Sequence, residues 1–156
     1  MDTKYKQIAR RQLDATLARF GEIKGVQLPP KGWVRAVREA LGMSGKQLAR
    51  RLKVSQPRVH KLEQSEPSGA LTIKTMRQVA EALDCVFVYA LVPRSTLEET
   101  VRTQARAVAG ERLQRVSHTM LLEAQGLSAQ EQQASLEAAI EELVRETPKD
   151  LWDMKS

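Results

Sequence analysis

The feature that most constrains the fold is a pair of short helical patterns, separated by only two or three residues, between Ser44 and Gln64. Ser44-Gly45-Lys46-Gln47 has the arrangement of a capping box, in which a serine hydroxyl and a glutamine side chain satisfy amides at a helix start. Ser55 is positioned to cap the second helix, with Pro57 in its first turn, where a missing N–H does no harm. The sequence therefore predicts two helices joined by a tight turn, with apolar side chains filling the angle between them: Leu48, Leu52, Val59 and Leu62.

The rest of the chain is also mainly helical in pattern. Helices are expected over residues 4–20, 33–41, 72–83, 95–125 and 128–144, with Gly110 as a possible break, Ser95-Thr96-Leu97-Glu98 as a second capping box and Ser128 as a further cap. The first helix carries one apolar stripe, for which the sequence offers no evident internal partner: Tyr5, Ala9, Leu13, Leu17 and Phe20.

In one segment the hydrophobic pattern changes from that of a helix to that of a strand. Residues 86–92 are rich in β-branched and aromatic side chains and are closed by Pro93, so they predict the one strand of the protein. A lone strand cannot satisfy its own backbone groups. It must pair, either with a second subunit or with a short extended piece near residues 23–28. We therefore expect a mainly α fold with one strand.

The charge of the chain is divided unevenly. Residues 1–65 hold 15 Lys/Arg against 5 Asp/Glu, whereas residues 66–156 hold 10 against 14, which together give the net charge of +6. A basic half of this kind suits a polyanion, and DNA phosphates are the commonest such partner. A merely solvated basic face is the alternative. An anionic membrane fits less well, because the cations do not line an amphipathic interfacial helix.

The residue inventory argues against an enzyme. Two histidines, His60 and His118, and one cysteine, Cys85, offer no Ser/His/Asp or Cys/His arrangement and no cluster with metal-ligand spacing. We expect Cys85 to lie in the core. No glycine-rich phosphate loop, apolar membrane span or signal peptide is present in the sequence. We expect no cofactor, no metal and a cytoplasmic location.

The middle of the chain resembles the Xre (Cro/C1-type) helix-turn-helix regulators. The residues that carry the resemblance are Gln47-Leu48-Ala49, Leu52, Val54-Ser55-Gln56, Val59, Leu62 and Glu63. It implies a lambda-repressor-like domain that binds double-stranded DNA, in which Glu63 has a structural role. Gly45 departs from the pattern, because the family usually has a phosphate-contacting glutamine there.

In a helix-turn-helix the second helix enters the major groove with its N-terminal part. Residues on the arc opposite Val59 and Leu62 are therefore expected to read bases: Gln56, Pro57, Arg58, His60 and Lys61. A glutamine can bind adenine through two hydrogen bonds, and a lysine or arginine can donate to guanine. Residues at the helix starts and in the turn are expected to contact phosphates: Ser44, Lys46, Arg50, Lys53 and Ser55.

The whole chain is similar to the mobile mystery protein A family, through Arg10-Arg11-Gln12-Leu13-Asp14, Pro30-Lys31-Gly32-Trp33 and residues 82–93. That resemblance implies an antitoxin-like autorepressor beside a toxin-like Fic-domain partner that transfers AMP. Thr119 and Glu123 match the spacing of the inhibitory Fic-antitoxin motif, but Ala124 replaces its Gly or Asn, and a plain surface glutamate is the simpler interpretation.

Three regions and one function follow from these patterns. Residues 1–31 are expected to form a helical arm and loop, residues 32–85 the DNA-binding domain, and residues 86–156 a strand with C-terminal helices for dimerisation or partner binding. We expect a homodimeric repressor that reads a pseudo-palindromic operator and regulates its own operon. The alternative is a protein-binding inhibitor of a Fic-domain partner, with DNA binding secondary.

Overall fold

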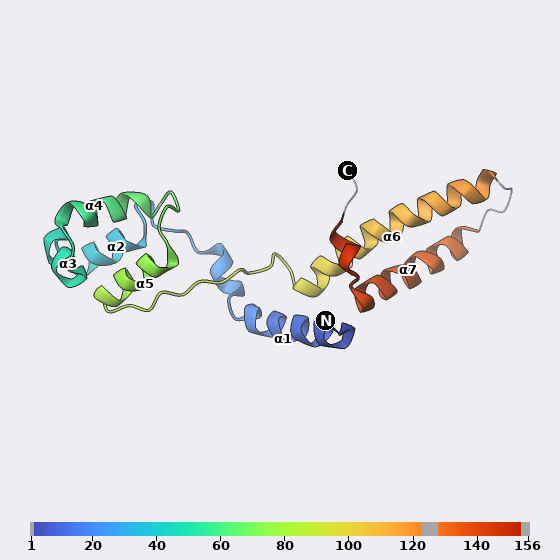
Figure 1. The fold of residues 1–156 in the computed structure, drawn as a ribbon, viewed down its shortest axis with the longest axis horizontal. Coiled ribbons are helices and arrows are strands. Elements are labelled where there is room, and N and C mark those ends of the chain that lie inside the picture. Colours follow the sequence, from blue (N-terminus) through green and yellow to red (C-terminus); the bar gives the residue numbers. More distant parts are fainter. Residues whose placement is uncertain (1, 123–127, 154–156) are drawn as a thin grey trace. The chain divides into compact units, whose positions relative to one another are not determined.

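A computed structural model describes residues 2–122 and 128–153, and every regular element within them is a helix (Figure 1). The mainly α class is therefore confirmed. The helices group into two compact units, Glu22–Ala90 (unit 2) and the residues up to Gly21 together with those from Leu91 onward (unit 1). The bounds are α1 Thr3–Ala18, η1 Gly21–Gly25, α2 Trp33–Ala40, α3 Gly45–Leu52, α4 Gln56–Ser65, α5 Ile73–Ala82, α6 Leu97–Leu122, α7 Ala129–Glu146 and η2 Lys149–Trp152.

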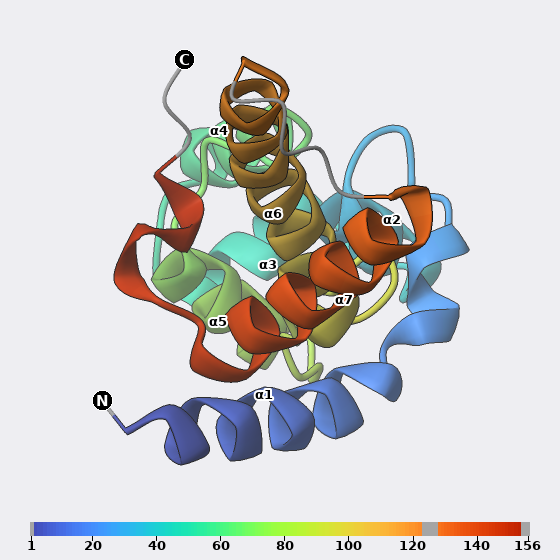
Figure 2. The same ribbon diagram turned by 90° about the vertical axis from the view of Figure 1, so that its right-hand side faces the viewer.

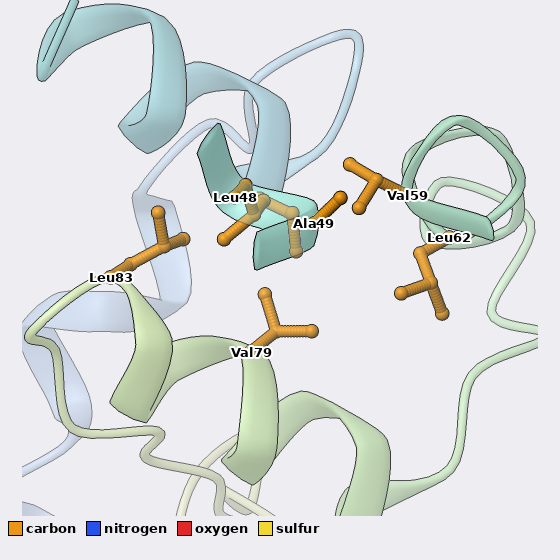
Figure 3. Packing of buried hydrophobic residues seen from close by; sticks show 7 residues of the cluster. Leu48, Ala49, Val59, Leu62, Val79 and Leu83 are labelled. Carbon is orange, nitrogen blue, oxygen red and sulfur yellow. The ribbon is translucent and has the colours of Figure 1, made fainter. Parts of the chain in front are cut away.

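Unit 2 is built around the two helices that the sequence placed next to each other. Leu48 and Ala49 of α3 meet Val59 and Leu62 of α4, and Val79 of α5 closes the cluster from below (Figure 3). Val34 and Leu83 complete the buried set, and Leu52 packs against it while only partly buried. Each large apolar side chain buried in this way contributes roughly 1.5–3 kcal/mol. The predicted filling of the angle between the helices is confirmed.

Unit 1 is a helical hairpin with a third helix beside it. Helices α6 and α7 run antiparallel, and α6 is continuous through Gly110, where the sequence allowed a break (Figure 1). Helix α1 packs against both (Figure 2). The core lies between α6, α7 and η2 and consists of Val101, Ala105, Ala109, Ile140, Leu143, Val144 and Leu151.

Helix α1 contacts its unit through polar side chains, which the sequence did not predict. Arg10 is buried and donates from Nε to Glu98 (2.5 Å), from NH1 to the Thr147 hydroxyl (3.2 Å) and from NH2 to the Val144 carbonyl (3.2 Å). Tyr5 and Leu13 of the apolar stripe are exposed. The Val144 carbonyl, in the last turn of α7, is an acceptor that a polar side chain of α1 can use and an apolar one cannot.

Two helices are capped by carboxylates from distant parts of the chain. The Glu66 carboxylate accepts from the amides of Trp33 (2.8 Å) and Val34 (2.9 Å) at the start of α2. In unit 1 the Asp14 carboxylate accepts from the amides of Leu97 (2.7 Å) and Glu98 (3.1 Å).

The predicted box beginning at Ser95 is therefore wrong. Thr96, one residue later, is the local cap of α6, since its hydroxyl accepts from the Glu99 amide at 3.0 Å. The amides that a Ser95 hydroxyl would have satisfied are taken by Asp14. The local caps predicted at Ser44, Ser55, Thr72 and Ser128 are present.

The predicted strand over residues 86–92 is also absent from the described part of the chain, where this segment has no ladder partner. The intramolecular alternative near residues 23–28 is not formed either, because η1 occupies Gly21–Gly25 and the Val26 amide donates to the Ile23 carbonyl. A strand exists only through pairing, and this chain supplies no extended neighbour.

Replacing Gly32 with alanine should destabilise unit 2. Gly32 has a φ of +83°, and a Cβ there would lie 2.6 Å from Oε2 of Glu66, whose two hydrogen bonds cap α2. We expect a loss of about 1–3 kcal/mol in chemical denaturation, from backbone strain and a weakened cap.

Gly45→Ala is the matched control, since its Cβ would meet no atom within 4 Å. At this helical position alanine should be neutral or stabilise by about 0.4–1 kcal/mol. Equal destabilisation by both substitutions would contradict the role assigned to Gly32.

Candidate nucleic-acid interface

The turn between α3 and α4 is closed by main-chain geometry. Lys53 adopts the left-handed conformation (φ 56°, ψ 41°), and the Val54 amide donates to the Ala49 carbonyl at 3.0 Å. Ser55 then starts α4, its hydroxyl accepting from the Arg58 amide at 3.4 Å. Two residues, Lys53 and Val54, thus separate the end of α3 from the cap of α4, and the two helices form a helix-turn-helix.

A buried ion pair fixes α4 to α2. Arg38 donates to both carboxylate oxygens of Glu63, at 2.5 and 3.2 Å, and to the Met43 carbonyl at 2.8 Å. Only 12% of the Arg38 side chain and 8% of the Glu63 side chain are exposed. Hydrogen bonding to Glu63 raises the pKa of Arg38 above its ordinary value, so the guanidinium stays charged. Glu63 is thereby structural, as the resemblance implied.

The five residues expected to read bases are all exposed on α4. With Val59, Leu62 and Glu63 buried, the arc formed by Pro57, His60 and Lys61 points away from the core. Gln56 and Arg58 lie in the first turn of the helix and are exposed as well. Their base contacts stay a prediction.

The five residues expected to bind phosphates are exposed too, around the start of α3 and the turn. Ser44 and Ser55 cap α3 and α4 with their hydroxyls, and Lys46 lies in the first turn of α3. Lys53 is in the turn, and Arg50 is in the last turn of α3. The N-termini of α3 and α4 therefore lie in the same stretch of chain as these cations. A helix N-terminus favours the binding of an anion.

Within the described part of the chain, the cations of this surface are not held in ion pairs by acidic side chains. Between Gly45 and Ser65 there are six Lys/Arg and one acidic residue, Glu63, which forms its ion pair with Arg38. None of the six takes part in an ion pair with another described residue. Unit 2 as a whole has 12 Lys/Arg against 6 Asp/Glu, whereas the rest of the chain has 13 against 13. The net charge of +6 thus belongs entirely to unit 2.

Clefts on both sides of α4 add residues that the sequence analysis missed. On one side, a cleft of about 680 Å³ is lined by Arg51, Lys53 and Arg58 together with Thr75, Gln78 and Glu81 of α5. On the other, a cleft of about 250 Å³ places Lys31 and Arg35 beside His60 and Gln64. Gln64 is exposed four residues after His60, so helical spacing alone would have found it. Lys31 and Arg35 come from another element, and only the fold brings them here.

Several expectations concern residues outside this surface. Cys85 is exposed rather than buried, so its placement in the core was wrong. Thr119 is exposed on α6 and donates to the Arg115 carbonyl at 3.0 Å, while Glu123 lies outside the described residues. Among the described residues, no three His, Cys, Asp or Glu side chains are grouped to hold a metal ion. Nor does this part of the chain contain a helix with the length and apolarity to span a membrane.

Comparison with known proteins identifies the class of unit 2. Residues 34–87, about a third of the chain, match a helix-turn-helix family of the Xre type. The matched range begins one residue into α2 and ends beyond α5, so it coincides with the helices of unit 2. No curated protein and no solved structure matches the chain. Unit 2 is therefore a helix-turn-helix domain, the class typical of DNA-binding regulators.

Removing one partner of the buried ion pair should destabilise unit 2 strongly. Glu63→Gln keeps the shape but leaves the Arg38 guanidinium buried without a counter-charge, so we expect a loss of roughly 3–5 kcal/mol in urea denaturation. The double variant Arg38→Met with Glu63→Leu should recover most of that loss.

Glu39→Gln is the control. Glu39 is exposed, and the neighbouring Arg35 lowers the pKa of its carboxyl. The midpoint of unfolding should hardly change, because exposed pairs contribute little. If Glu63→Gln unfolded at the same urea concentration as Glu39→Gln, α4 would have another anchor.

Proposed function

We propose that this protein is a sequence-specific double-stranded DNA-binding transcriptional repressor that uses α4 as its recognition helix. The observation that carries the proposal is the set of six cations over α3, the turn and α4 of a helix-turn-helix, none of which is paired with an acidic side chain of the described residues. Such a surface releases counterions when it meets a duplex, which supplies affinity for any sequence. The exposed arc of α4 supplies the hydrogen-bonding groups that distinguish bases.

Two substitutions test the readers. Gln56→Ala and Lys61→Ala should each reduce discrimination between the operator and a scrambled duplex by roughly 1–3 kcal/mol, because each removes a base contact. The operator is found by footprinting the region upstream of this protein's own gene, and binding is measured by fluorescence anisotropy.

The matched comparison is a variant of a residue that is expected to contact a phosphate. Lys46→Ala should weaken binding to both duplexes alike and lower the slope of log K against log salt by about 0.9. Lys149→Ala, an exposed lysine of unit 1, should change neither quantity. If the α4 variants and Lys46→Ala had the same effect on operator and scrambled DNA, the assignment of readers would fail.

The proposal extends to assembly and regulation. We infer a homodimer in which each α4 reads one half of a pseudo-palindrome, with half-sites about 10 bp apart, one turn of DNA. Repression of its own operon is supported by the resemblance to mobile mystery protein A regulators, and so is the antitoxin-like role beside a Fic-domain protein. The footprint of the upstream region also tests the dimer and the repression of its own operon, because it gives the position and the symmetry of the protected site.

A second candidate function is inhibition of a Fic-domain partner by unit 1. It is favoured by the fact that unit 1 has its own core and no excess of positive charge, so reading DNA makes no use of it. The inhibitory residues would be Thr119 and Glu123. DNA binding by unit 2 and partner binding by unit 1 are compatible.

Co-expression with the Fic protein of a neighbouring gene tests this candidate. The two proteins should co-purify, and Glu123→Ala should release AMP transfer by the partner while operator binding stays unchanged. Glu111→Ala, which removes an exposed glutamate of α6 that pairs with Arg115, is the control and should release nothing. Absence of a complex, or equal release by both variants, would rule out the inhibitory role.

A further inference from the structure

We propose that residues 86–92 pair with the same residues of a second copy of this chain, as a two-stranded antiparallel ribbon with Tyr89 on the symmetry axis. The inference rests on the dimer of the proposed function and specifies the segment and register that hold it together. It concerns an assembled state, since the single chain has no strand here.

The backbone of this segment is unsatisfied over a sharply bounded run. Within the described part of the chain, no backbone hydrogen bond involves residues 86–92. The run is bounded on one side by Cys85, whose amide donates to the Ala80 carbonyl at 2.8 Å, and on the other by Pro93, which has no N–H. Seven consecutive residues thus have free donors and acceptors, and the midpoint of the run is Tyr89.

The side chains hold the segment extended and leave apolar surface uncovered. The rings of Phe87 and Tyr89, two residues apart, stack at 5.9 Å, which is the same-face spacing of extended backbone. Tyr89 is fixed on α5 by Arg77, whose guanidinium lies 5.6 Å from the ring centre. Val86 is 87% exposed and Leu91 is 93% exposed. An apolar cleft of about 360 Å³, lined by residues 85–88 and by side chains of α2 and α5, lies against the same segment.

An exposed apolar segment with free backbone groups is a template for strand addition. A second copy of the segment is the occupant that matches it in length, because both runs end at the same residues. In the antiparallel register centred on Tyr89, Val86 lies opposite the partner's Val92, and Phe87 lies opposite the partner's Leu91. Apolar side chains then meet apolar side chains along the whole ribbon, which stabilises an antiparallel pair.

The ends of the run select this register over its neighbours. Asp84, just before the run, has a φ of +58° and lies in the turn that ends α5, and Pro93 closes the other end without an N–H. The antiparallel register that pairs all seven residues is the one centred on Tyr89. A shift by one residue in either direction leaves one residue of each copy unpaired, so the full pairing places the two-fold axis at Tyr89.

Disulfide trapping without DNA tests the register directly. In a Cys85→Ser background, Tyr89→Cys should form a covalent dimer under mild oxidation, because residues directly opposite have Cα atoms about 4.5–5.5 Å apart, within disulfide reach. Leu91→Cys should not link to its own copy, since the two would lie four residues apart, about 14 Å. Phe87→Cys mixed with Leu91→Cys should link as a heterodimer.

Exposure makes Leu91→Cys a stringent control. Leu91 is 93% exposed against 58% for Tyr89, so random collision would link position 91 faster. The ribbon predicts the reverse order, with linkage at 89 about tenfold faster. Sedimentation of the unmodified protein should show a dimer, and amide exchange in residues 86–92 should slow as concentration rises.

Three results would overturn the proposal: a monomer at micromolar concentration, a dimer that links faster at 91 than at 89, or amides of residues 86–92 that exchange at one rate at every concentration. A monomer would also be the result if residues 86–92 bound a different protein instead of a second copy of this chain. None of these experiments contains DNA. A failure of the ribbon therefore leaves operator binding by a monomer testable, and a failure of operator binding leaves the ribbon testable.

Discussion

The attachment of α4 to α2 by two carboxylates is the interaction on which the rest of unit 2 depends. Glu63 accepts both hydrogen bonds from Arg38, and Glu66, three residues later, closes the start of α2. Both acids lie on the inner side of α4 or just past its end. The same contacts therefore hold the helix in place and remove negative charge from its outer face, so that stability and the electrostatics of the surface have one origin.

Charge is divided unevenly between the units, with a balance of +6 in unit 2 and of zero in unit 1. Unit 1 holds as many acidic as basic residues, and some of them pair within it, as with Arg10 and Glu98 or Arg102 and Glu141. Unit 2 retains the entire positive excess. A polyanion will therefore be attracted to one unit only, and the screening of that attraction by salt is a property of unit 2.

Sequence reasoning succeeded where the determining contacts are local. The caps at Ser44, Ser55 and Ser128 lie three residues from the amides they satisfy, so the pattern alone predicts them. It failed where the partner is distant: Asp14 reaches amides 83 and 84 residues away, and Arg10 binds the end of α7. The arc of α4 was predicted because burial of Val59 and Leu62 fixes it. Lys31 and Arg35 could not be placed beside that arc, since only the tertiary fold brings them there.

The chain enters unit 1, leaves it to build unit 2, and returns to finish unit 1. During translation, α1 leaves the ribosome more than 70 residues before the α6 amides that Asp14 will cap. Unit 2, which spans Glu22–Ala90, is complete by then and can fold at once. A nascent chain can thus bear a finished helix-turn-helix while the Arg10 guanidinium is still solvated and without its acceptors. Premature termination anywhere in α7 would release that half-assembled species, with the basic surface of α3 and α4 intact.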